Sequence, residues 1–306
     1  MSCSKDDRLI DENTINFHKS EKDKLKETGA KSYNDEEYTS LNNSKWMSQL
    51  SDSVKIEEIS LPGTHNTCAL YGGSIAECQS MSIQEQLKSG IRFMDIKCRL
   101  IDQVFTIHHG VIYQEINFGE IIISLKKFLK VNPSETVFIR VKKEYSDGVK
   151  DNDFIEVFER YLVEHGRHNF YVPKPSEKYN IPESLGSVRG KIVIIENVWG
   201  LPGIKWNSLK IQDDYKVETP FDIPEKYKKI TNHLETSARD KDNIYLNFTS
   251  GNSSFGLALP YFIAGHINED LLDYLKVNSR IKTGIVAMDY PGDDLIQAII
   301  NTNNFI

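Results

Sequence analysis

Short apolar runs that alternate with helical patterns are the feature that most constrains the fold of this 306-residue chain. The runs are β-branched and apolar on both faces, as buried parallel strands are. The predicted strands are residues 92–96, 104–107, 136–141, 191–195, 244–248 and 283–288. The predicted helices are residues 82–89, 118–131, 152–165, 224–238, 268–277 and 293–301. This alternation predicts an α/β fold, an irregular TIM-like (β/α) barrel, with a doubly wound open sheet as the competing architecture.

Ionisable residues stand where the predicted strands end. The residues concerned are His65 after the turn 61–64, Asp95 with Lys97, His108 with His109, Lys142 with Lys143, and Asp289. In a barrel the carboxyl ends of the strands share one rim, where active sites are built, so these side chains are expected to meet there. Strands also end simply where solvent begins, but that explains less well why both acids and imidazoles recur at these positions.

The composition excludes several classes of function. The net charge is −7 and no long Lys/Arg block is present, so nucleic acid is not an expected partner. The sequence contains no run of 18 or more apolar residues, so no transmembrane segment is predicted. Residues 1–12 contain no apolar core of a signal peptide. The cysteines Cys3, Cys68, Cys78 and Cys98 form no CxxC pair, which argues against zinc. Cys68 and Cys78 are expected either to bridge in an oxidising compartment or to remain free thiols.

The chain divides into two parts by composition. Residues 1–44 are polar and lack sustained apolar periodicity, so we predict a disordered or loosely attached N-terminal tail. Residues 45–306 are predicted to form one folded domain that acts as a monomer.

The groups on the predicted rim suit the cleavage of a phosphodiester. One imidazole can take a proton from an attacking hydroxyl while another gives a proton to the leaving oxygen. A fixed cation stabilises charge that develops on the phosphate, and a carboxylate behind an imidazole sets its tautomer and raises its pKa. The residue types alone do not identify the phosphodiester.

Ten segments in order resemble the catalytic X domain of the phosphatidylinositol-specific phospholipases C, most closely the small bacterial enzymes. They are residues 45–47 (KWM), 60–65 (SLPGTH), 90–96 (GIRFMDI), 108–110 (HHG) with Tyr113, 132–136 (NPSET), 142–145 (KKEY), 189–193 (RGKIV), 212–215 (QDDY), 247–250 (NFTS) and 288–290 (MDY). Each segment alone is a weak signal, but their shared order is a strong one. The resemblance covers the chain from about Trp46 to the C-terminus.

The resemblance implies a role for each matched residue. His65 resembles the general base that deprotonates the inositol 2-hydroxyl, Asp289 its carboxylate partner, and His109 the general acid. Lys142, Asp213 and Tyr215 match positions that bind the inositol ring. The implied reaction releases diacylglycerol and inositol 1,2-cyclic phosphate without a cofactor. The implied partner is phosphatidylinositol at a membrane surface. The resemblance also implies that this protein is secreted or associated with the cell surface.

Two departures from the family pattern lie within the predicted site. Asn66 stands where the bacterial pattern has Asp, so His109 is expected to lose a charged partner and to be less often protonated. Lys97 stands where the pattern has Arg, which replaces two aligned donors by one ammonium. The calcium-dependent branch of the family also carries Asn at position 66, but a lysine near Asp95 would repel calcium, so no metal is predicted. Asn197 is an outer departure, where bacterial enzymes often carry a charged inositol contact.

Two other functions remain open at this stage. A weakened X domain would bind inositol lipids or glycans without turnover, as Asn66 and Lys97 suggest. The same fold could also act on another glycerophosphodiester, which the intact ring-binding set disfavours. His108 and Lys143 are interpreted as structural or surface residues. The apolar stretch 255–262 is either a lipid-facing rim or the core of a following helix.

Overall fold

The computed structural model describes residues 31–145, 148–174, 176–254 and 256–306. Its strands are β1 (Leu61–Thr64), β2 (Phe93–Ile101), β3 (Val104–His109), β4 (Ile112–Asn117), β5 (Val137–Lys143), β6 (Ile192–Glu196), β7 (Ile204–Lys205), β8 (Lys210–Gln212), β9 (Tyr245–Phe248) and β10 (Ile285–Met288). The predicted strands are therefore present, with boundaries that shift by a few residues. The short strands β1, β4, β7 and β8 were not predicted.

The sheet is a curled parallel barrel rather than a doubly wound sheet. Its path runs β7-β6-β5-β2-β1-β10-β9-β8, and every pair along this path is parallel. Chain order therefore proceeds around a ring without the reversal that defines a doubly wound sheet. In the described part of the chain no ladder joins β7 to β8, so the ring has one seam between these two short strands.

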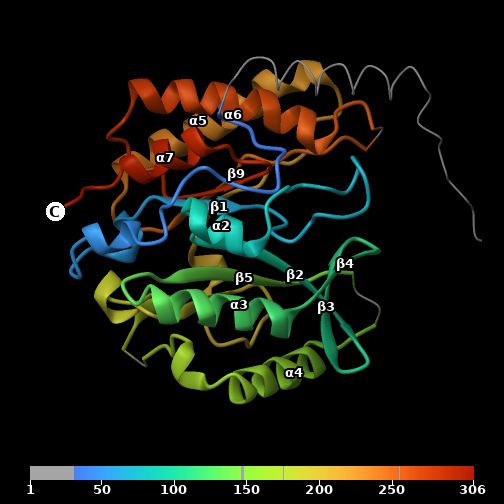
Figure 1. Ribbon diagram of the computed structural model, residues 1–306, viewed down its shortest axis with the longest axis vertical. Helices are drawn as coiled ribbons and strands as arrows, with labels where there is room; N and C mark the ends of the chain where they lie inside the picture. The colour runs from blue at the N-terminus through green and yellow to red at the C-terminus, as the bar shows by residue number, and fades with distance from the viewer. Residues whose placement is uncertain (1–30, 146–147, 175, 255) are drawn as a thin grey trace, which may run out of the picture.

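Helices cover the outside of the sheet on two sides. They are α2 (Ile83–Ser89), α3 (Phe118–Val131), α4 (Asp151–Glu164), α5 (Ile223–Arg239), α6 (Pro260–Val277) and α7 (Asp293–Asn301). Single-turn 3-10 helices are η1 (Trp46–Gln49), η2 (Ile56–Glu58), η3 (Arg167–Asn169), η4 (Lys178–Asn180), η5 (Leu185–Ser187), η6 (Trp206–Ser208) and η7 (Pro220–Asp222). Figure 1 shows α5, α6 and α7 on one side of the strands and α3 and α4 on the opposite side. No described helix has both the length and the apolarity needed to cross a membrane.

Local sequence signals explain where the helices begin and end. The Ser82 hydroxyl accepts a hydrogen bond from the backbone of Glu85 at the start of α2, and Gly90 ends this helix with a φ of 120°. Asn117 and Glu120 form a capping box at the start of α3. Helix α6 begins at Pro260, eight residues before the predicted start at 268, because proline is well suited to a first helical turn.

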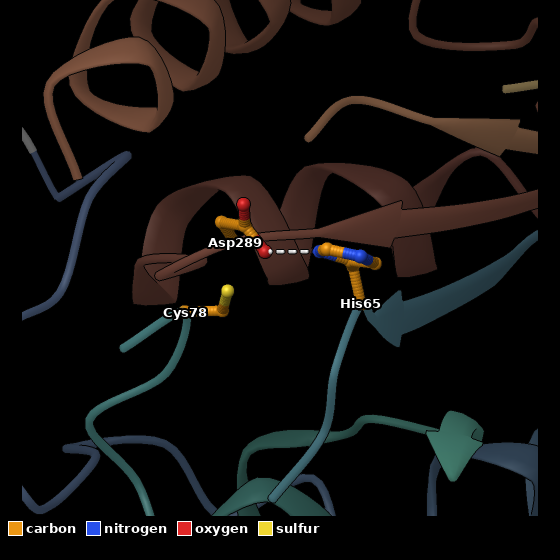
Figure 2. A group of neighbouring side chains, drawn as sticks. All are labelled: His65, Cys78 and Asp289. Atoms are coloured by element: carbon orange, nitrogen blue, oxygen red, sulfur yellow. Dashed lines mark hydrogen bonds and ion pairs between the residues drawn. The ribbon is translucent and has the colours of Figure 1, made fainter. Parts of the chain in front are cut away.

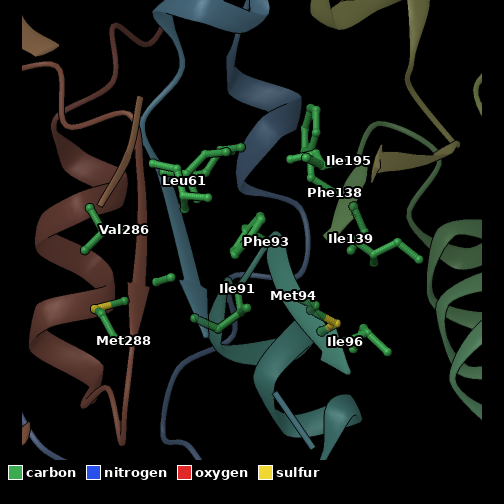
Figure 3. Packing of buried hydrophobic residues seen from close by; sticks show 14 of the residues in the cluster. Leu61, Ile91, Phe93, Met94, Ile96, Phe138, Ile139, Ile195, Val286 and Met288 are labelled. Atoms are coloured by element: carbon green, nitrogen blue, oxygen red, sulfur yellow. The ribbon is translucent and has the colours of Figure 1, made fainter. Parts of the chain in front are cut away.

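The core lies inside the barrel and between the sheet and its helices. Buried side chains of neighbouring strands line this core, for example Phe93 on β2 and Phe138 on β5, which pair in register (Figure 3). The predicted strands β6, β9 and β10 are buried along their whole length, which confirms the expectation from their apolar character on both faces, and the unpredicted strand β1 is buried as well.

Strand β3 differs from its prediction as a parallel barrel strand. It pairs antiparallel with β2 and continues into the antiparallel strand β4. The turn Asp102–Gln103 explains this difference: both residues have positive φ, and a two-residue turn of this type joins antiparallel strands. The chain thus runs out along β2 and returns along β3, which brings His109 back towards the barrel.

Residues 31–44, predicted to belong to a disordered tail, pack against the barrel. Tyr33 forms a β-bridge with Pro291, and its ring lies 5.4 Å from that of Tyr290. Thr39 and Ser40 bond to the Asp293 carboxylate at the start of α7. The composition did not predict this docking, because single residues without periodic spacing make the contacts. The remainder of the predicted tail, residues 1–30 with Cys3, lies outside the described residues.

The thiols of Cys68, Cys78 and Cys98 are free and buried. Of the two readings of Cys68 and Cys78, the structure supports free thiols. The stretch 255–262 belongs mainly to the core reading, because Leu259, Tyr261 and Phe262 are buried while Leu257 is exposed. Phe255 lies outside the described residues.

Candidate active site

A close approach between two strands positions the turn that carries the first histidine. A Cβ on Gly63 would lie 2.7 Å from the side chain of Phe93, so glycine lets β1 and β2 pair closely. After β1, the Thr64 and Thr67 hydroxyls lie 2.8 Å apart, and Thr64 donates to the side chain of Gln86 over 2.8 Å. These buried bonds hold the turn that presents His65.

His65 and Asp289 form a hydrogen-bonded pair at the ends of adjacent strands. Their atoms Nδ1 and Oδ1 are 2.8 Å apart (Figure 2), and Asp289 is buried. A carboxylate can only accept, so Nδ1 carries the proton and Nε2 is left as a proton acceptor. The Gln79 amide bonds the carbonyls of His65 and Met288, and the Phe248 ring meets the imidazole edge to face at 5.9 Å. The imidazole is therefore held in one orientation and one tautomer.

His109 reaches the site from the hairpin and has a neutral partner. Its Nδ1 lies 2.6 Å from the carbonyl oxygen of Ala76, so Nδ1 donates and Nε2 is free to exchange a proton. Burial lowers the pKa of His109, the Ala76 carbonyl partly offsets this, and the charges of Lys97 and His65 lower the pKa further. His109 is consequently less often protonated near neutral pH than an ordinary histidine.

One cavity of about 250 Å³ at the carboxyl ends of the strands brings these residues together, and we call it the rim cavity. Its lining contains His65, Asn66, Cys78, Lys97, His109, Arg140, Lys142, Asp213, Tyr215, Phe248, Ser250, Gly251, Asn252, Pro260 and Asp289. Every predicted site residue except Asp95 is in this wall. The strand-end pattern therefore predicted a real meeting point.

Asp95 lies directly behind the wall of the rim cavity. It accepts from the backbone N–H of Asn66 over 3.2 Å and from the Arg140 guanidinium over 3.2 Å. Burial alone would raise the pKa of Asp95, but Arg140, with Lys97 and His65, outweighs burial and holds this pKa well below its usual range. Asp95 is thus a buried carboxylate that holds both the turn containing Asn66 and the guanidinium of Arg140.

Asn66 bonds through its side chain to Cys78 rather than to His109. Its φ of 42° is a left-handed conformation that asparagine tolerates, and its Nδ2 donates to Cys78 Sγ over 3.5 Å. Its Oδ1 is buried and accepts no hydrogen bond within the described chain. His109 uses the Ala76 carbonyl instead, a partner that no side-chain motif could reveal.

The ring-binding set is assembled from two sides of the barrel. Lys142 is the penultimate residue of β5, and burial together with the charges of Lys97 and Arg140 lowers the pKa of its ammonium. Asp213 and Tyr215 follow β8, while Asp214 between them turns away to pair with Lys229. This alternation is that of an extended segment, in which residues i and i+2 share a face. Lys143 faces away and pairs with Asp151, and His108 is buried beside the ring of Tyr113.

Sequence reasoning missed four polar members of the wall: Arg140, Cys78, Ser250 and Asn252. Arg140 precedes Lys142 by two residues on one strand, so the period of two was a usable signal. Cys78 had no signal, since it enters from the long β1–α2 connection. Within the described chain the ligand atoms of His65, Cys78 and Asp289 lie within 4.8 Å of one another, the one such group able to hold a metal ion (Figure 2). In this group His65 Nδ1 and Asp289 Oδ1 are already hydrogen-bonded to each other.

Comparison with known proteins identifies the family. Residues 56–197 match the family model described as phosphatidylinositol-specific phospholipase C, X domain. The chain is 30% identical to a 1-phosphatidylinositol phosphodiesterase of Staphylococcus aureus over 84% of this chain and 93% of that relative. The chain belongs to the phosphatidylinositol-specific phospholipase C family. A relative of the same name from Listeria monocytogenes is 28% identical over 87% of each chain.

Solved structures of the family share this fold. The Listeria monocytogenes phosphatidylinositol-specific phospholipase C has a TM-score of 0.77 and 26% identity, with 87% of this chain and all of that chain covered. A Staphylococcus aureus phosphatidylinositol-specific phospholipase C has a TM-score of 0.75 and 28% identity over 86% of this chain and 98% of that one. These values confirm the predicted family and fold class.

Proposed function

We propose that this protein is a phosphatidylinositol diacylglycerol-lyase, which cleaves phosphatidylinositol to diacylglycerol and inositol 1,2-cyclic phosphate. The observation that carries the proposal is that His65 and His109, from separate strands, line one cavity with the lysines 97 and 142. Their Nδ1 atoms are both occupied as donors, so each presents Nε2 for proton transfer. The names of the bacterial relatives give the substrate class.

In the proposed reaction the substrate supplies its own nucleophile. His65 Nε2 takes the proton of the inositol 2-hydroxyl, whose oxygen attacks phosphorus and closes the cyclic phosphate. The bond from phosphorus to the diacylglycerol oxygen breaks, and His109 Nε2 gives its proton to that oxygen. Because the attacking hydroxyl and the phosphorus belong to one molecule, the reaction gains the advantage of an intramolecular step.

The charged residues around the two histidines have complementary tasks. The Asp289 carboxylate stabilises the imidazolium that forms on His65, as a paired carboxylate does in other acid–base sites. The Lys97 ammonium stabilises negative charge on the phosphate oxygens. Lys142, Asp213 and Tyr215 bind the inositol hydroxyls, and Asp95 and Asn66 fix the base-carrying turn. We propose that no metal takes part, because Asp95 already uses its oxygens for Arg140 and Asn66.

Exposed apolar side chains near the rim support contact with a lipid surface. They lie in the segments that follow the strands and in the β3–β4 turn: Tyr71, Ile75, Val111, Tyr145, Trp199 and Leu257. Since the chain is acidic overall, apolar contacts of this kind are better suited to hold it at a membrane than charge attraction is. The proposed partner is therefore phosphatidylinositol presented in a bilayer.

The proposal is tested on phosphatidylinositol vesicles with phosphorus NMR of the water-soluble product. We expect cyclic inositol phosphate and diacylglycerol, at the same rate with and without a chelator. His65→Ala and His109→Ala are each expected to lower kcat by roughly 10²- to 10⁴-fold, as loss of a general base or acid does. His168→Ala, at an exposed position, is the matched control. Absence of cyclic product from the wild-type protein would refute the proposal.

One observation favours a second candidate, a lipid-binding domain without turnover. His109 has a lowered pKa and a carbonyl partner, so its acid form is less populated near neutral pH than that of an ordinary histidine. This candidate predicts sedimentation with phosphatidylinositol vesicles and no release of diacylglycerol at any pH. Turnover that appears as the pH is lowered would instead support the lyase.

A further inference from the structure

Arg140 places a guanidinium in the wall of the rim cavity that the proposed mechanism does not use. The residue lies on β5, and its side chain shares a strand face with Lys142. Cα registers pair Arg140 with Asp95 and Lys142 with Lys97 on the neighbouring strand β2. The four side chains therefore form two layers, with the ion pair below and the two lysines above.

The guanidinium is held rigidly by three groups. Its Nε and Nη2 donate to Asn197 Oδ1 over 3.0 and 2.8 Å, and Nη1 donates to Asp95 Oδ1 over 3.2 Å. Its central carbon lies 4.1 Å from the centroid of the Trp206 ring, a stacking distance. A guanidinium has five N–H groups, so one on Nη1 and one on Nη2 are not used by the described chain.

Arg92, the other strongly buried arginine at the barrel, shows what a structural guanidinium looks like here. It is 0% exposed and pairs with Glu135. All five of its N–H groups are used: two bind Glu135, and three bind the backbone carbonyls of Asn43, Leu87 and Ile91. Arg140 is nearly as buried, at 5% exposed, but keeps two donors and borders a cavity. Leaving buried donors unused is costly unless a ligand completes them.

We infer that Arg140 is a substrate-contacting residue, whose two remaining N–H groups bind the phosphate of the inositol phosphate headgroup. This inference rests on the proposed function. Two N–H donors on one planar guanidinium suit two oxygens of a phosphate, whereas each neighbouring lysine offers a single point charge. With Lys97 and Lys142 in the layer above, Arg140 completes a cationic site beneath the two histidines.

The experiment measures binding of two soluble probes, myo-inositol 1-phosphate and myo-inositol, by calorimetry. The wild-type protein is expected to bind the phosphorylated probe more tightly. Arg140→Lys retains the positive charge that pairs with Asp95 but removes the paired N–H donors of the guanidinium. Arg140→Gln removes both the charge and these paired donors. We expect affinity for inositol 1-phosphate to fall about tenfold in the first variant and up to about a hundredfold in the second, with affinity for inositol nearly unchanged. Lys143→Gln, on the opposite face of β5, is the matched control.

The outcomes separate this inference from the proposed function. Equal losses for both probes, no loss in a folded Arg140→Lys protein, or unfolding of both variants would each assign Arg140 to the fold and overturn the inference. Phosphate-dependent binding without any turnover would refute the lyase while keeping the role of Arg140. A wild-type protein that turns over lipid but shows no effect of Arg140→Lys would keep the lyase and overturn the role of Arg140.

Discussion

The two histidines of the rim cavity have hydrogen-bond partners of different charge. His65 follows a strand of the barrel and bonds to a buried carboxylate at the end of the adjacent strand β10. His109 ends an antiparallel hairpin outside the parallel path and bonds to a backbone carbonyl of the β1–α2 connection. A carboxylate stabilises imidazolium by a full charge, whereas a carbonyl offers a dipole. We therefore expect the proposed general base, His65, to keep its function when nearby charges change, and the proposed general acid, His109, to limit the reaction.

Asp289→Asn tests the charged partner and is expected to have the largest effect. The amide can donate to Nδ1, which would reverse the tautomer of His65 and place a proton on Nε2. We expect kcat to fall about 10²- to 10⁴-fold with little change in KM, by analogy with carboxylate–histidine pairs elsewhere. Steady-state kinetics on vesicles measure this, and circular dichroism checks the fold. A loss of less than fivefold would show that His65 does not depend on the carboxylate charge.

Asn66→Asp tests His109, the histidine whose hydrogen-bond partner is neutral. The wild-type enzyme should lose activity as pH rises through the lowered pKa of His109, because a general acid must be protonated to act. A carboxylate at position 66 adds negative charge to the cavity, which raises the pKa of His109 and moves this alkaline limb to higher pH. We expect kcat near pH 8 to rise roughly three- to tenfold. An unchanged pH–rate profile would contradict the assignment of the alkaline limb to His109.

Tyr33→Ala tests whether the docked segment 31–44 supports the base side, and the expected effect on activity is small. The Tyr33 ring packs on Tyr290, next to Asp289, and the backbone N–H of Asn34 donates to the Tyr290 carbonyl. We expect a loss of about 2 kcal/mol in the free energy of unfolding and about a twofold fall in kcat.

Tyr33→Phe is the matched control for this change. The Tyr33 hydroxyl is buried without a hydrogen-bond partner in the described chain, so its removal should leave stability unchanged or higher. Urea unfolding of both variants supplies the measurement. If Tyr33→Phe were as destabilising as Tyr33→Ala, the hydroxyl rather than the packed ring would hold the segment.

The parts of the site that sequence predicted share a physical signature. His65, Lys97, Lys142 and Asp289 stand directly after or near the end of apolar runs, and parallel strands bring such ends to one rim. Arg140 carried the same signature through its spacing from Lys142, but it lies outside the matched segment 142–145. Ala76 carried none, since any residue type supplies a carbonyl oxygen.

By itself, the sequence determined the parallel core strands, most of the helices and the set of polar residues at the rim, because periodicity and burial are properties of each segment alone. The tertiary structure decided the direction of β3, the docking of residues 31–44 and the hydrogen-bond partners of His109, Asp95 and Arg140. These depend on which backbone and side-chain atoms meet across long separations in the chain. No local pattern encodes a partner of that kind, because the free energy of each such bond is set by the geometry of both sides at once.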